Sequence, residues 1–239
     1  MIDKNFIFNN PIPKGEIPAY SEVKNNFIDE VFIEVKESDR IKIDLQYPKL
    51  GFENAVNKAY IRKSAYEKLL RAVEILPEEY CFKILDTWRP FKLQKELFYK
   101  YSDKIIKEFN LKRISEEEQV KFISQFVADP IENRDYPPMH TTGGAIDLII
   151  IKDNGEELDL GVEFDEFSSK TNTAYFEEKD ENEEIKINRR ILYNIMTQVG
   201  FTNLSSEVWH YDYGNKNWAY YTKQPGLYKG VFDEDEIKL

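Results

Sequence analysis

The chain has only two histidines, and each lies in a short motif with the spacing of a metal site. His140 begins the run His140-Thr-Thr-Gly-Gly-Ala-Ile-Asp147, and His210 ends the run Glu207-Val-Trp-His210. Zinc binds imidazole nitrogen and carboxylate oxygen, and a catalytic site uses three protein ligands with one position left open. His140, Asp147 and His210 can supply three such ligands. The sequence therefore predicts one zinc ion per chain, with an ordinary structural histidine as the alternative at each position.

Asp147 is an unusual residue for its surroundings, because it interrupts an apolar, β-branched run over residues 145–151 that should form a central strand. A buried carboxylate is costly unless its charge is compensated. Two glycines between His140 and Asp147 allow the backbone to fold so that both side chains reach one ion. A metal would compensate the charge, and an ordinary salt bridge is the alternative.

Glu207 is a candidate general base. A glutamate beside a metal-activated water can accept its proton and later deliver it to a leaving amine. In a regular strand, however, residues three apart point to opposite faces. Glu207 and His210 can therefore share a site only if the chain bends or if Glu207 precedes the strand. The alternative is an exposed strand carboxylate.

Arg89 follows a short apolar strand predicted over residues 81–85, and Pro90 restricts it to an extended conformation. Amide hydrolysis builds negative charge on the carbonyl oxygen, and a fixed guanidinium aimed at that oxygen would stabilise the transition state. A surface arginine is the alternative.

The elements that must position these residues follow from periodicity and capping signals. We expect a hairpin of residues 31–35 and 41–45, and strands at 81–85, 145–151 and 208–213. We expect four helices: one after a Ser64–Glu67 capping box with Tyr66, Leu69, Leu70 and Val73 inward, one over 92–109, one from a Ser115–Glu118 capping box to about residue 127, and one capped by Asn188 and ended by Gly200. This order predicts a single α+β domain over residues 1–239, with helices packed on a mostly antiparallel central sheet that carries the metal site.

Composition narrows the class of partner. The chain has 33 basic and 44 acidic residues, a net charge of −11, which disfavours nucleic acid. No apolar run reaches membrane-spanning length, and the first residues do not resemble a signal peptide, so we expect a cytoplasmic protein. Cys81 is the only cysteine, which excludes a disulfide within the chain. Acidic runs over residues 177–184 and 233–236 are expected to be a solvated insertion and tail, with partner binding as the alternative.

The combined motifs resemble those of the D-alanyl-D-alanine dipeptidases, zinc enzymes of the vancomycin-resistance type. The resemblance rests on His140-x-x-Gly-Gly-Ala-Ile-Asp147-Leu and Glu207-x-Trp-His210-Tyr-Asp-Tyr-Gly. It extends over residues 44–218 through the following segments: Asp44-Leu-Gln-Tyr47, Trp88-Arg89-Pro90, Leu160-Gly161-Val-Glu-Phe164-Asp165, Asn188-Arg-Arg-Ile-Leu-Tyr and Gly200-Phe-Thr-Asn.

This resemblance implies that His140, Asp147 and His210 bind zinc. It also implies that Glu207 is the general base and Arg89 the stabiliser of the oxyanion. Asp165 would hold the ammonium group of a free dipeptide, as a carboxylate can. Nearby acidic residues remain rivals for that last role, namely Asp159, Glu163 and Glu166.

The chain departs from the family pattern at two positions. Pro138-Met139 stands where some relatives have serine before the first histidine, and Val208 replaces a common tryptophan. The implied activity is hydrolysis of D-alanyl-D-alanine. The alternatives are a D,D-carboxypeptidase or peptidoglycan endopeptidase with the same metal site, and a zinc-stabilised binding protein without catalysis, since the Hedgehog signalling domain has this kind of site.

Overall fold

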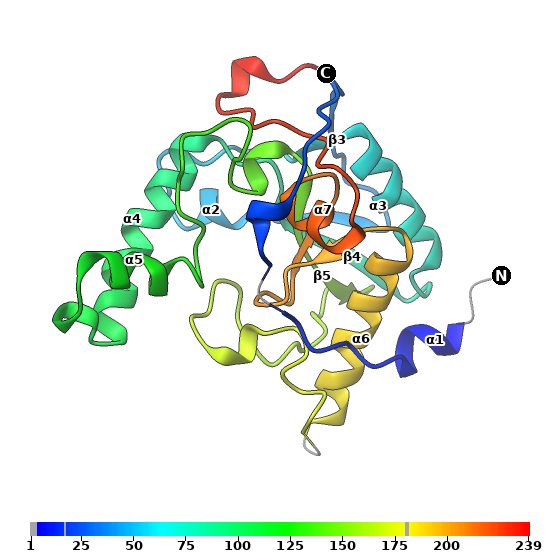
Figure 1. Cartoon of the computed structure of the whole chain (residues 1–239). Helices are drawn as coiled ribbons and strands as arrows, with labels where there is room; N and C mark the ends of the chain where they lie inside the picture. The colour runs from blue at the N-terminus through cyan, green and yellow to red at the C-terminus, as the bar shows by residue number, and fades with distance from the viewer. Residues whose placement is uncertain (1–3, 17, 180–181) are drawn as a thin grey trace.

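A five-stranded sheet forms the centre of the computed structural model, which describes residues 4–16, 18–179 and 182–239 (Figure 1). Its strand order is β2-β4-β5-β7-β6, and β1 pairs with β3 in a separate two-stranded sheet. The strands are β1 (Phe32–Glu34), β2 (Ile41–Ile43), β3 (Tyr60–Arg62), β4 (Tyr80–Asp86), β5 (Ala145–Lys152), β6 (Thr202–Asn203) and β7 (His210–Asp212). Among the strand pairings of the described residues, only β2–β4 is parallel. The α+β class with a mostly antiparallel sheet is therefore confirmed, whereas a single domain over residues 1–239 stays a prediction.

Seven α-helices surround the sheets within the described ranges. They are α1 (Lys4–Asn9), α2 (Gln46–Lys49), α3 (Lys63–Ile75), α4 (Phe91–Glu108), α5 (Glu116–Ile123), α6 (Glu183–Gln198) and α7 (Lys216–Thr222). Apolar residues of α3 and α6 pack with β4 and β5 in the largest core cluster. A second cluster joins α4 and α5, which lie on the opposite side of the sheet from α3 and α6 in Figure 1. The helices α3 and α6 thus pack on the sheet, whereas α4 and α5 pack mainly on each other.

The predicted hairpin of residues 31–35 and 41–45 is wrong. β1 pairs antiparallel with β3, while β2 joins the main sheet parallel to β4. Phe32 of β1 packs in a small cluster with Tyr60 and Trp88, whereas Ile41 of β2 packs in the main core. Alternating residues predict that a strand has one buried face, but they do not identify its partner.

The capping predictions had mixed outcomes. The Ser115–Glu118 capping box is confirmed, although α5 ends at Ile123 rather than near residue 127. The Ser64–Glu67 box is wrong, because α3 begins at Lys63 and the backbone amide and hydroxyl of Ser64 both bind the Glu30 carboxylate, at 3.1 and 2.5 Å. A distant carboxylate therefore occupies the place that the sequence assigned to a local one.

Two further helix details differ from the predictions. Leu70 is 40% exposed, because Ala65, Leu69 and Ala72 form the buried face of α3. Asn188 lies inside α6, which begins at Glu183, and its side-chain amide donates to the Asp159 carbonyl at 2.9 Å. A buried asparagine in a helix interior can be satisfied by a long-range acceptor, which sequence alone does not reveal.

The acidic segments are more structured than expected. Within residues 177–184, the Glu177 carboxylate accepts from Arg190 Nε at 2.8 Å and is largely buried, and Glu183 and Glu184 lie in the first turn of α6. Residues 180 and 181 lie outside the described residues. In the tail, Asp233 pairs with Lys92 and Glu236 pairs with Arg134. Cys81 is buried. None of the helices described here is both long and apolar enough to span a bilayer.

Candidate active site

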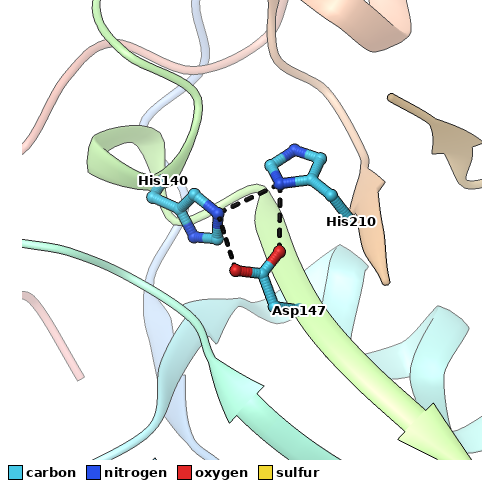
Figure 2. Close-up of side chains that lie close together, drawn as sticks. All are labelled: His140, Asp147 and His210. Atoms are coloured by element: carbon cyan, nitrogen blue, oxygen red, sulfur yellow. Dashed lines mark hydrogen bonds and ion pairs between the residues drawn. The ribbon is translucent and has the colours of Figure 1, made fainter. Parts of the chain in front are cut away.

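The three predicted ligands converge at the centre of the main sheet. Asp147 of β5 lies directly opposite His210, the first residue of β7, and His140 begins a short 3-10 helix before β5. Figure 2 shows both imidazole rings and the carboxylate pointing toward one another. His140 Nε2 lies 3.1 Å from His210 Nδ1 and 3.4 Å from Asp147 Oδ2. One donor atom from each residue lies within 4.8 Å of the others, a spacing that one cation can bridge.

The remaining polar atoms of these side chains show that the set fits a metal. His140 Nδ1 donates to the Thr87 carbonyl at 2.7 Å, which leaves the Nε2 lone pair facing the other two residues. His210 Nε2 lies 3.0 Å from Asp212 Oδ1, so Nδ1 is the ring nitrogen of His210 that faces the other two residues. Asp147 Oδ1 is buried and, apart from its 3.0 Å contact with His210 Nδ1, has no polar partner among the described residues. Two imidazole nitrogens and a buried carboxylate that face one another form a donor set that fits a cation.

The electrostatics agree with this interpretation. His140, Asp147 and His210 are only 6%, 2% and 2% exposed. Burial by itself would raise the pKa of the Asp147 carboxyl, but the His140 and His210 imidazoles hold that pKa well below its ordinary value. The group is therefore an anion despite its burial, and an anion is the form that binds a metal.

The sequence allows Glu207 and His210 to share a site only if the chain bends or if Glu207 precedes the strand, and the structure meets this condition. Glu207 precedes β7, and a turn closed by the His210 amide on the Glu207 carbonyl at 3.2 Å lets both side chains face one site. Glu207 Oε2 lies 3.9 Å from His210 Nδ1, and the side chain is 23% exposed. Burial of the carboxyl raises the pKa of Glu207 to about 7. A carboxyl with this pKa can both accept and donate a proton near neutral pH.

Arg89 is buried beside the ligands and is not a surface residue. Its Nε and Nη2 donate to Asp86 Oδ2 at 3.0 and 2.8 Å, Nη1 donates to Gln94 at 2.7 Å, and Nη2 also donates to the Tyr47 hydroxyl at 3.1 Å. These bonds fix the plane of the guanidinium. They use four of its five N–H groups among the described residues, which leaves one on Nη1.

Asp165 lies in the loop between β5 and α6, with a left-handed backbone at φ 58°. Its carboxylate accepts from the Tyr101 hydroxyl at 2.8 Å and lies 3.5 Å from the Tyr47 hydroxyl. Asp165 and Glu207 line one small cleft, together with Trp209. Burial raises the pKa of Asp165 to about 6, so the carboxyl becomes charged only above mildly acidic pH.

The three rival carboxylates are placed differently. Asp159 and Glu163 are exposed and do not line the cleft. Glu166 lines it, but its carboxylate accepts from the Ser168 hydroxyl at 2.5 Å and the Glu163 amide at 3.2 Å. Asp165 is thus the best placed of the four to receive a cationic group.

Comparison with known proteins agrees with the motifs. The sequence profile of the D-ala-D-ala dipeptidase family of peptidases matches residues 54–226, well over half of the chain. The chain belongs to this family. The matched range contains all of the candidate site residues, namely Arg89, His140, Asp147, Asp165, Glu207 and His210.

Named relatives and one solved structure extend the comparison. A D-alanyl-D-alanine dipeptidase of Synechocystis is 27% identical over 154 residues, covering 59% of this chain and 62% of that protein. A D-alanyl-D-alanine dipeptidase of Escherichia coli is 36% identical over 73 residues, 30% of this chain and 36% of that protein. The match therefore covers less than two thirds of either relative. A vancomycin-resistance D,D-pentapeptidase, VanY, solved with Zn(II), is 16% identical with a TM-score of 0.39, covering 86% of this chain and 96% of that one.

Several residues that support the site in this family member were missed in the sequence. Asp86 binds Arg89 and lies 3.4 Å from His140 Nδ1, and Asp212 contacts His210. A signal existed for Asp212, because residues two apart in a strand share a face. For Asp86 the signal was weaker, since an irregularity in the β4–β5 pairing between Ile84 and Asp86 orients its side chain.

Proposed function

We propose that this chain is a zinc-dependent hydrolase of the free dipeptide D-alanyl-D-alanine, with one zinc ion per chain. The observation that carries the proposal is the convergence of His140, Asp147 and His210 beside Glu207. Three ligands of zinc type with an adjacent carboxylate form the donor set of a zinc hydrolase. Membership of the D-ala-D-ala dipeptidase family supports the same reaction class.

The roles of the residues in this proposal follow from their chemistry. Zinc held by the three ligands would supply a Lewis acid for the scissile carbonyl and would lower the pKa of water. Glu207 accepts the proton of the attacking water and returns it to the leaving amine nitrogen. Arg89 donates its remaining N–H to the carbonyl oxygen as negative charge develops there.

Asp165 sets the substrate class in this proposal. In a free dipeptide, the residue that supplies the scissile carbonyl also carries the ammonium group. Asp165 is a suitable partner for this group, because its carboxylate is partly buried and lines the same cleft as Glu207. An acylated nitrogen has no positive charge and would leave the Asp165 carboxylate uncompensated. The position of Asp165 therefore favours a dipeptidase over a carboxypeptidase, whose substrates continue beyond that nitrogen.

The experiment is a substrate panel for the zinc-loaded chain: D-alanyl-D-alanine, its N-acetyl derivative and a stem pentapeptide ending in the same two residues. We expect release of D-alanine from the free dipeptide only. Glu207→Gln should retain zinc and lose about a hundred- to ten-thousandfold in kcat. Preferential cleavage of the pentapeptide would assign the chain to the carboxypeptidases, and zinc binding without hydrolysis of any of the three would favour a binding protein.

A further inference from the structure

A segment outside the family match passes beside the active site. We call residues 10–16 and 18–26 the N-terminal strap; in Figure 1 it runs from α1 across the front of the molecule toward the end where the C-terminus lies. Two hydrogen bonds anchor its first part to α6 and to the loop before α6. The Asn10 side-chain amide donates to Asn194 Oδ1 at 3.0 Å, and the Ile12 backbone amide donates to Glu177 Oε1 at 3.0 Å. Its last part is anchored by the Asn26 amide on the Gly226 carbonyl at 2.8 Å. The strap is thus fixed at both ends.

Between these anchors the strap contacts the turn that leads to Glu207. The Glu16 carbonyl accepts from the Ser205 hydroxyl at 3.4 Å and from the Tyr221 hydroxyl at 3.2 Å. A Cβ atom added at Gly15 would lie 2.1 Å from Ser205 Cβ. The approach is so close that only glycine fits without moving one of the two segments.

The strap also reaches the metal ligands through a chain of buried polar groups. The Tyr20 hydroxyl donates to Asn217 Oδ1 at 2.9 Å, and Asn217 Nδ2 donates to Asp212 Oδ2 at 2.8 Å. Asp212 Oδ1 then lies 3.0 Å from His210 Nε2. Asn217 and Asp212 are both 0% exposed. The Asn217–Asp212 link is therefore shielded from water, while the Tyr20–Asn217 link is partly buried.

We propose that Tyr20 is a positioning residue for His210, acting through Asn217 and Asp212. Without the Tyr20 hydroxyl, the buried Asn217 oxygen would lose its hydrogen bond, and the amide would be held only through its nitrogen, on Asp212 and on the Asn203 carbonyl. A less constrained Asp212 would hold the His210 ring less firmly in the orientation that presents Nδ1 to the metal. The inference rests on the zinc site of the proposed function, but not on the substrate.

The experiment measures the zinc affinity of the full chain by competition with a chelator, without substrate. Groups that support a metal ligand typically contribute about 10- to 100-fold in affinity, and Tyr20 is one link further away, so Tyr20→Phe should weaken zinc binding by about three- to tenfold. Tyr221→Phe is the matched control, because it removes another hydroxyl contact of the strap and leaves the Asn217 path intact. Its zinc affinity should be unchanged.

Two results would overturn the inference: unchanged affinity in Tyr20→Phe, or an equal loss in Tyr221→Phe, which would indicate general loosening of the strap. A second comparison tests the path. In an Asp212→Asn background, Tyr20→Phe should cause no additional loss, and a full additional loss would also contradict the path. The measurement is zinc binding and does not depend on hydrolysis. If Tyr20→Phe weakened zinc binding as expected in a chain that does not hydrolyse the dipeptide, this inference would be supported and the proposed function would fail. An unsubstituted chain that binds no zinc would refute both.

Discussion

The two halves of the candidate site are built differently. The metal half consists of His140, Asp147 and His210, which are buried on two paired strands and the turn before them. The amine half centres on Asp165, which lies in a loop, has a left-handed backbone and is held by the hydroxyls of Tyr101 and Tyr47. The first half takes its geometry from strand pairing, and the second from side chains of separate elements.

The same residue type behaves in opposite ways in the two halves. The pKa of Asp147 is held below its ordinary value because two imidazoles outweigh the effect of burial. The pKa of Asp165 is raised to about 6 because burial outweighs the tyrosine hydroxyls and Arg89. The Asp147 carboxyl is therefore ionised at all physiological pH values, whereas the charge of the Asp165 carboxyl depends on pH. Neighbours, and not residue type, determine which carboxylate is suited to a permanent cation.

The largest effect is expected from removing a ligand in the metal half. His210→Ala should abolish activity and weaken zinc binding by more than about a hundredfold, because a ligand contributes more than the groups that support it. The measurement is zinc content after dialysis. We expect nearly one zinc ion per chain in the unsubstituted protein and nearly none in His210→Ala. Retention of zinc and activity by His210→Ala would remove His210 from the site.

Arg89 lies between the halves, since its guanidinium contacts both Tyr47 and Asp86. Arg89→Ala should lower kcat by about a hundred- to a thousandfold, as the loss of one oxyanion donor does, with zinc content unchanged. Arg134→Ala, at an exposed arginine paired with Glu236, is the control and should leave kcat unchanged. An increase in KM alone would instead indicate that Arg89 binds the substrate ground state.

The smallest effect is expected in the amine half and concerns pH. An ammonium group pairs with ionised Asp165, so dipeptide affinity should increase as pH rises through about 6 and then level off. Calorimetric binding in a Glu207→Gln background avoids turnover and removes the second carboxyl that titrates nearby.

Asp165→Asn should remove this pH dependence and weaken binding at pH 7.5 by roughly 10- to 100-fold, the usual contribution of a charged hydrogen bond. The Tyr101 and Tyr47 hydroxyls and Arg89 face the same carboxylate, so Tyr101→Phe should shift the pH midpoint upward by removing a bond that lowers the pKa of Asp165. A pH dependence that persists in Asp165→Asn would assign it to another group.

The sequence predicted those parts of the molecule that depend on local chemistry. The spacing of His140 and Asp147, with one strand after two glycines, indicated a shared ion, and the Ser115–Glu118 pair indicated a helix start that the structure contains. For Glu207 and His210, the sequence indicated that both side chains could face one site if Glu207 preceded the strand. In the structure, Glu207 does precede β7.

Tertiary structure alone decided which segments became partners. The alternation over residues 31–45 could not reveal that β1 pairs with β3 and β2 with β4, since alternation describes a face and not a neighbour. Nor could it show that Asp86 would support both Arg89 and His140. By itself the sequence determined the donor atoms and their local spacing, because these depend on residue type and on a few backbone angles. The pairing of distant strands determined the burial and orientation that make those donors one site, because long-range contacts fix the electrostatic environment of each group.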